Sequence, residues 1–161
     1  MLTWTERVML HNQFRILELL DPSRAEEYQQ KQDIVGKGYE ALYATLNENV
    51  SGEPAPRSVS EEVHEILELF RTLHNSSRTI GSTEASPLIR FQGFDSDKEP
   101  DHYGYAIFVI EKQGLWPEHR AESYSSHAPM LPKYSRMIEA WRRVGRTRDL
   151  GRDQLEEIAG A

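Results

Sequence analysis

Apolar residues recur every three or four positions through most of this chain, and that spacing is the period of an α-helix. The pattern is clearest between residues 59 and 76, where Ser58 and Glu61 have the spacing of a capping box at the helix start. The stripe consists of Val59, Val63, Ile66, Phe70 and Leu73. Such a stripe is stable only when other elements cover it, so we expect a fold of packed helices.

The first helix, expected to run to about Leu20, is apolar on much more than one stripe. Thr3 or Thr5 is its N-cap, and Glu6 follows Thr3 at the capping-box spacing. Its apolar positions are Val8, Met9, Leu10, Phe14, Ile16, Leu17, Leu19 and Leu20. A single packing neighbour does not need so many apolar positions, so we expect this helix to be buried on most sides and the chain to self-associate.

Two amide side chains, Asn12 and Gln13, interrupt this apolar field. Both lie one helical turn from apolar residues on either side, so both are expected to point into the interior. A buried amide without a hydrogen-bond partner costs about 1–3 kcal/mol, so each should bind backbone, another side chain or a ligand. An interhelical clamp is the commoner arrangement, and a ligand contact is the alternative.

Asp21 and Pro22 are typical of an N-cap and a first helical residue, and they predict the start of a second helix. Its apolar heptad phase continues through Gly36 and Gly38, whereas a break would have reset that phase. We therefore predict one long helix over residues 22–47, loosened or kinked at the two glycines.

The stretch from residue 88 to residue 112 is ambiguous. Residues 105–110 are β-branched and aromatic and suit a buried strand, with residues 88–92 as its other half. Acidic capping residues and Pro100, which fits a first helical turn, favour a helix over residues 97–112 instead. The helix is the interpretation that we prefer.

A long loop over residues 113–129 precedes two final helices, 131–144 and 152–159. Loops longer than about 12–15 residues are uncommon inside compact domains and are often functional. The fold class expected is all-α, with five or six helices in a single domain over residues 1–161. At most a minor strand pair near residues 88–92 accompanies them.

Composition excludes several classes of protein. A chain of 161 residues suits one compact domain, and the absence of cysteine excludes a disulfide scaffold, thiolate catalysis and cysteine-containing zinc sites. The start of the chain lacks the pattern of a secretory signal, and no apolar run approaches the roughly 18 residues of a membrane span. We therefore expect a cytoplasmic protein that does not contact membranes.

The net charge of −7 is unevenly distributed. Residues 133–152 contain seven basic and two acidic side chains, so this segment carries +5 and the rest of the chain −12. The acidic body disfavours nucleic acid, whereas the basic segment is able to attract an anionic partner. A solvated helix face is the commoner explanation of such a segment.

Five strings together are similar to a known family. They are ERVMLHNQFRILELLDP at 6–22, VGKGYE at 35–40, FQGFD at 91–95, YGY at 103–105 and PMLPKYSRMIEAW at 129–141. In order and spacing they resemble the YfbU family of bacterial and archaeal proteins, over essentially the whole chain. The resemblance implies a largely helical single domain, and the family supplies no established activity and no catalytic residue.

Some YfbU relatives join this domain to a helix-turn-helix DNA-binding module, which implies a role in ligand sensing. We expect no such module in this chain. Any effector role would then be carried out alone or through a partner.

The side-chain clusters that could carry chemistry are incomplete. Glu61 and His64 have the spacing of a di-iron helix pair, but no second Glu-x-x-His follows, so no metal site is expected. The acidic cluster at residues 95–101 could hold Mg²⁺, although acidic residues at a helix start are also favoured by the helix dipole. We assign no cofactor and no catalytic residue, and the sequence leans away from an enzyme.

We therefore expect a regulatory or effector-type module that recognises a small molecule or a protein partner. Its predicted ligand site consists of Asn12, Gln13, Asp95, Tyr103, His119 and His127. The alternative is a nucleic-acid-binding protein or a metal-dependent nuclease that uses the acidic cluster at 95–101 and the basic segment at 133–152. The arginines of that alternative are Arg142, Arg143, Arg146 and Arg148.

Overall fold

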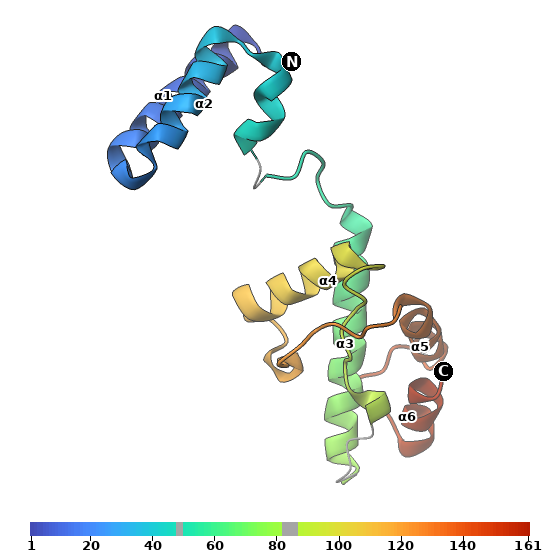
Figure 1. Cartoon of the computed structure of the whole chain (residues 1–161). Coiled ribbons are helices and arrows are strands. Elements are labelled where there is room, and N and C mark those ends of the chain that lie inside the picture. The colour runs from blue at the N-terminus through green and yellow to red at the C-terminus, as the bar shows by residue number, and fades with distance from the viewer. Residues whose placement is uncertain (48–49, 82–86) are drawn as a thin grey trace. The chain divides into compact units, whose positions relative to one another are not determined.

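The chain forms two compact units in a computed structural model that describes residues 1–47, 50–81 and 87–161. The first unit is Met1–Pro54 and the second is Ala55–Ala161 (Figure 1), and each has its own cluster of buried apolar side chains. That the whole chain is one domain stays a prediction.

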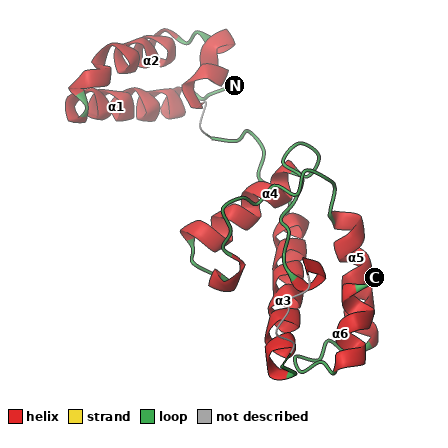
Figure 2. Cartoon of the chain, turned by 60° about the horizontal axis from the view of Figure 1, so that its bottom comes forward, coloured by secondary structure: helices red, strands yellow, loops and turns green. Residues whose placement is uncertain are grey.

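The first unit is built on a helical hairpin of α1 (Trp4–Leu20) and α2 (Ala25–Lys37), which lie side by side (Figures 1 and 2). The predicted capping box is confirmed, because Glu6 N donates to Thr3 Oγ1 at 3.2 Å and Thr3 N donates to a Glu6 carboxylate oxygen at 2.7 Å. A short 3-10 helix, η1 (Pro22–Arg24), connects the two helices. The small core consists of Phe14, Tyr28, Val35 and Leu46.

The prediction of one helix over residues 22–47 is wrong. α2 ends at Lys37 because Gly38 adopts a left-handed conformation with φ of 73°, which glycine tolerates at a helix end. A 3-10 helix, η2 (Glu40–Asn47), follows and returns Leu46 to the core. The regular spacing of apolar residues thus continues through Gly36 and Gly38, although the α-helix ends at Lys37.

The second unit is organised around its longest helix, α3 (Arg57–Thr79), which contacts the three other α-helices of this unit (Figure 2). All five residues of the predicted stripe are buried in α3. The predicted capping box at Ser58 is wrong, because the helix begins two residues earlier than predicted, at Arg57, after Pro56, whose extended ψ of 137° ends the preceding loop.

The remaining helices of the second unit match their predicted positions closely. α4 (Pro100–Ile107) continues into a π-helical turn, η4 (Phe108–Lys112), which together replace the predicted helix over 97–112. α5 (Leu131–Arg143) and α6 (Arg152–Ala159) follow, and α6 has the predicted bounds.

Residues 88–92 form no strand pair. A short 3-10 helix, η3 (Pro87–Ile89), leads into an irregular segment that passes through the core and makes one parallel β-bridge, Phe94 to Ser125. Tyr134 holds this segment, since its hydroxyl donates to Gly93 O at 2.9 Å and accepts from Gln92 N at 3.2 Å. Burial of this hydroxyl raises the pKa of Tyr134 well above its usual range.

The fold class is all-α, as predicted. The described residues contain six α-helices. The 3-10 helix η2 is as long as the shortest of them, and counting it gives seven helices in this part of the chain, slightly more than the five or six expected. None of the helices in the described ranges combines the length and the apolar character that crossing a membrane requires. The cytoplasmic location stays a prediction.

Candidate functional site

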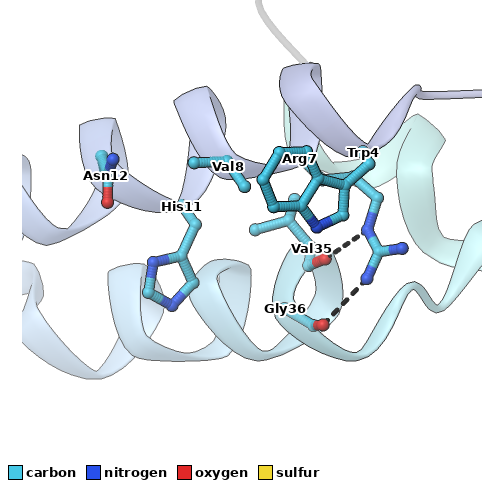
Figure 3. Close-up of a pocket in the computed structure, with 7 residues that line it drawn as sticks. All are labelled: Trp4, Arg7, Val8, His11, Asn12, Val35 and Gly36. Atoms are coloured by element: carbon cyan, nitrogen blue, oxygen red, sulfur yellow. Dashed lines mark hydrogen bonds between the residues drawn. The ribbon is translucent and has the colours of Figure 1, made fainter.

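The first unit has a pocket between the N-terminal half of α1 and the C-terminal end of α2 (Figure 3). Its volume is about 230 Å³. The lining residues are Trp4, Arg7, Val8, His11, Asn12, Val35 and Gly36. Aromatic, apolar and polar groups therefore meet in one concave site, which is the usual composition of a ligand pocket.

Arg7 forms one wall of this pocket and joins the two helices. Its Nε donates to Val35 O at 2.7 Å and one of its terminal nitrogens donates to Gly36 O at 2.8 Å. Both carbonyls belong to the last turn of α2, whose carbonyls lack partners within the helix and attract cations. Sequence reasoning did not identify Arg7. The signal for its contact with α2 is a basic side chain one helical turn before His11.

The side of α1 that α2 leaves uncovered is apolar and exposed. We call it the outer face of α1 and define it as Trp4, Val8, Met9, Asn12, Ile16, Leu19 and Leu20. The exposed fractions include 74% for Trp4, 55% for Ile16 and 75% for Leu19. The expectation that this helix is buried on most sides is not met within the first unit, where Phe14 is its only buried residue.

Asn12 and Gln13 are both exposed in the first unit instead of pointing into its core. The physical reason is the direction of α2, which covers the side of α1 that carries Phe14. Asn12 lies about 200° from Phe14 around the helix axis, so it is placed in the middle of the outer face. The structure places Asn12 in the pocket lining but does not place Gln13 there.

The other four predicted ligand residues belong to the second unit and have separate roles. Asp95 is buried, and its Oδ1 accepts hydrogen bonds from the backbone amides of residues 97 and 98 at 2.9 and 3.1 Å. Tyr103 packs against the larger core, and His127 is exposed beside Ser125. Because the two units are not placed relative to each other, the predicted combined site of all six residues stays a prediction.

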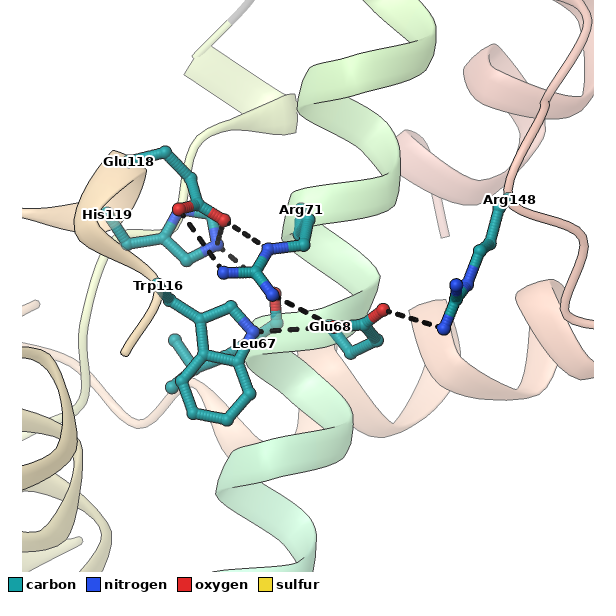
Figure 4. Close-up of polar contacts among 7 residues, drawn as sticks. All are labelled: Leu67, Glu68, Arg71, Trp116, Glu118, His119 and Arg148. Carbon is teal, nitrogen blue, oxygen red and sulfur yellow. Dashed lines mark hydrogen bonds and ion pairs between the residues drawn. The ribbon is translucent and has the colours of Figure 1, made fainter. Parts of the chain in front are cut away.

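His119 lies against α3 (Figure 4). Its Nε2 donates to Leu67 O at 3.1 Å, and its ring packs beside Phe70 and Phe91. Burial lowers the pKa of His119, because the low-polarity surroundings disfavour the charged ring. The ring is thus neutral at pH 7 with its proton on Nε2, since a carbonyl oxygen only accepts.

The loop before His119 is fastened to α3 by polar contacts (Figure 4). Trp116 Nε1 donates to a Glu68 carboxylate oxygen at 3.4 Å, and Arg71 Nε donates to Glu118 at 2.5 Å. The Arg71 guanidinium also lies 5.4 Å from the centre of the Trp116 ring. These contacts hold Trp116 in a left-handed conformation with φ of 49°, which is strained for a non-glycine residue.

The four arginines of the nucleic-acid alternative all lie beside carboxylates. Arg142 binds Glu65 through both its Nε and a terminal nitrogen, and Arg146 binds the same carboxylate. Arg143 pairs with Glu157 at 3.3 Å, and a nitrogen of Arg148 lies 3.6 Å from Glu68. Glu65 and Glu68 of α3 and Glu157 of α6 thus compensate part of the positive charge that the sequence places in residues 133–152.

Two residues of the acidic cluster at 95–101, Asp95 and Glu99, accept hydrogen bonds from backbone amides. Glu99 is buried, and one of its oxygens accepts from the amides of Met130 and Leu131 at 2.8 Å each, at the N-terminus of α5. Its second oxygen accepts from Asp95 N at 3.0 Å. Within the described ranges, no group of three or more His, Asp or Glu side chains has the geometry to hold a metal ion.

A comparison with known protein families shows which family the chain belongs to. The sequence profile of the YfbU domain matches residues 1–161, which is the whole chain. The chain belongs to the YfbU family. The strings that carried the resemblance now have structural roles in this YfbU chain: VGKGYE ends α2 beside Arg7, and FQGFD passes through the core beside Tyr134.

Proposed function

We propose that this YfbU chain is a regulatory or effector-type recognition module and that the outer face of α1 is its binding surface. The observation that carries the proposal is the exposure of six large apolar side chains on one face of one helix. Burying each from water is worth about 1.5–3 kcal/mol. Contiguous apolar surfaces of this kind on soluble proteins usually mark sites of interaction.

A second copy of the chain is the partner that we propose. Thr5, Met9, Asn12, Ile16 and Leu19 follow one another at spacings of four, three, four and three, which is the seam of a two-helix coiled coil. The described part of the second unit exposes far fewer large apolar side chains, namely Leu88, Phe108 and Leu115. The outer face of one copy therefore finds its best apolar complement in the outer face of another.

Asn12 supports a symmetric arrangement of the two copies. In a two-fold symmetric interface, a residue on the axis meets its own counterpart. An amide side chain carries both a donor and an acceptor group, so two Asn12 side chains are able to satisfy each other. One asparagine within an apolar seam sets the register and the number of helices in coiled coils, and we assign this role to Asn12.

The pocket connects small-molecule recognition to the same surface. Trp4, Val8 and Asn12 belong both to the pocket lining and to the outer face of α1. A small molecule in the pocket would change the surface that the second copy contacts. We propose this overlap as the route by which a ligand regulates association.

The proposal is tested by the mass of the particle in solution. Light scattering after size-exclusion chromatography is expected to give a dimer or larger for the native chain. The double variant Ile16→Asp and Leu19→Asp should give a monomer, because two charges on each seam would be desolvated on association. Circular dichroism should show unchanged helix content, since both positions are exposed in the first unit.

The matched control is Leu115→Asp, which introduces a charge at an apolar position of the second unit that is 44% exposed. This variant should keep the native mass. A monomeric native chain, or an Ile16→Asp and Leu19→Asp variant that retains the native mass, would contradict the proposed partner.

A further inference from the structure

The second unit has a groove between the chain that follows η3 and the loop over residues 117–123. It consists of two adjoining hollows of about 250 and 750 Å³. Both hollows are lined by Arg90, Phe91, Arg120 and Ala121, so they form one continuous groove. Its size is within the range of pockets that hold small organic molecules.

The floor of the groove is apolar except for one ring nitrogen. Ile89, Phe91 and His119 line it and are only 5, 7 and 8% exposed. The Nε2 proton of His119 is used by Leu67 O, so Nδ1 of the neutral ring is a hydrogen-bond acceptor. A flat apolar ring is able to lie on this floor, and a donor group attached to it is able to hydrogen-bond to His119.

The rim of the groove carries two arginines whose charge is poorly compensated. Among the described residues, no carboxylate lies within ion-pair distance of Arg90, and Arg120 Nε lies 3.9 Å from Glu111, beyond hydrogen-bond range. Glu118 is engaged by Arg71, which leaves Glu122 as the remaining acidic side chain of the lining. This arrangement contrasts with that of Arg142, Arg143 and Arg146 of α5 and the following turn, each of which faces a carboxylate.

The wall of the groove is held in place before any ligand arrives. Trp116 and Glu118 fasten the start of the loop to Glu68 and Arg71 of α3, and the strained conformation of Trp116 persists because of these contacts (Figure 4). A preformed wall lowers the entropy that a ligand loses on binding. Strained loops of this kind gather at ligand sites.

From this geometry we infer that the groove binds a small organic anion. Its carboxylate or phosphate group lies between Arg90 and Arg120, and its apolar body lies on Phe91 and Ile89. The groove shares no residue with the outer face of α1, so this inference does not depend on self-association.

Two-dimensional ¹H–¹⁵N NMR of the full chain tests the inference with named probes. Benzoate and phenyl phosphate should cause saturable shifts of the backbone amides of Phe91 and Ala121 in the millimolar range. Benzamide has the same shape without the charge and should bind at least tenfold more weakly, because it has no negative charge and forms no bidentate ion pair with arginine.

Two charge variants locate the anion. Arg90→Gln together with Arg120→Gln should weaken benzoate and phenyl phosphate binding at least tenfold. Arg152→Gln removes an exposed charge of the same unit outside the groove and should leave binding within about twofold. A well-dispersed NMR spectrum of each variant would show that the variant is folded.

Three results would overturn the inference. One is equal binding of benzoate and benzamide, and another is unchanged binding after loss of Arg90 and Arg120. The third is the absence of saturable shifts at the groove for both anions.

Discussion

At the scale of single residues, Gly93 and Tyr134 determine how the segment after η3 crosses the second unit. Gly93 has φ of 81°, and a Cβ atom added there would lie 1.8 Å from Tyr124 O. No shift of a flexible side chain relieves this contact, because the obstacle is backbone. The positive φ of Gly93 and the closeness of the Tyr124 backbone therefore explain why the chain needs glycine at this position.

Gly93→Ala should lower the free energy of unfolding of the second unit by about 3 kcal/mol or more, because left-handed strain and a backbone clash add. Gly104→Ala is the matched control. Gly104 lies in α4 with open space around its Cβ position, so alanine should raise stability by about 0.5–1 kcal/mol. Urea denaturation measures both, and equal effects of the two variants would contradict the assigned role of Gly93.

At the scale of secondary-structure elements, Arg7 connects α1 to the end of α2. Its two hydrogen bonds satisfy carbonyls that the helix itself leaves unpaired. Gly38 keeps room for this guanidinium, since a Cβ atom there would lie 3.0 Å from it. The hairpin of the first unit is thus closed by the hydrogen bonds of Arg7, by those from Gln29 and Gln32 to Glu18, and by its small core.

Arg7→Met retains most of the apolar stem and removes both hydrogen bonds. We expect it to destabilise the first unit by about 1–3 kcal/mol, with the last turn of α2 opening first. Hydrogen exchange followed by mass spectrometry should show faster exchange in residues 34–39. Arg15→Met changes an exposed arginine of the same helix, and exchange as fast as in Arg7→Met would argue against the proposed contact.

Sequence periodicity predicted where helices occur better than where they end. The buried stripe of α3 and the bounds of α6 followed from spacing alone, because burial of one face determines that spacing. The end of α2 did not, because the 3-10 helix after Gly38 continued the same apolar phase. Local conformation at one glycine overrode the longer pattern.

Pairings between distant positions were beyond sequence reasoning. Arg142 and Glu65 are 77 positions apart, so the basic segment looked uncompensated until α3 and α5 were placed together. Asn12 was predicted to point into the interior but is exposed in the lining of a pocket, because the side of α1 that α2 covers depends on the packing of Phe14. The groove beside Arg90 likewise depends on a loop geometry that no local pattern encodes.

At the scale of the whole molecule, we propose that self-association through α1 is the central property of the chain. The outer face of α1 is too apolar to be a typical solvated surface, and the first unit alone does not cover it. Two copies that meet along this face would bury both surfaces at once. Recognition of a ligand in the adjoining pocket would then act on the assembly.

The most direct test is a disulfide across the proposed symmetry axis, because the chain contains no cysteine and any added thiol is unique. Asn12→Cys should form a covalent dimer under mild oxidation, since residues at a two-fold axis approach within disulfide distance. Gln30→Cys, an exposed position on α2, is the control and should remain largely uncrosslinked. Rapid and nearly complete dimerisation of Asn12→Cys alone is the predicted result, and equal, slow crosslinking of both variants would contradict the account.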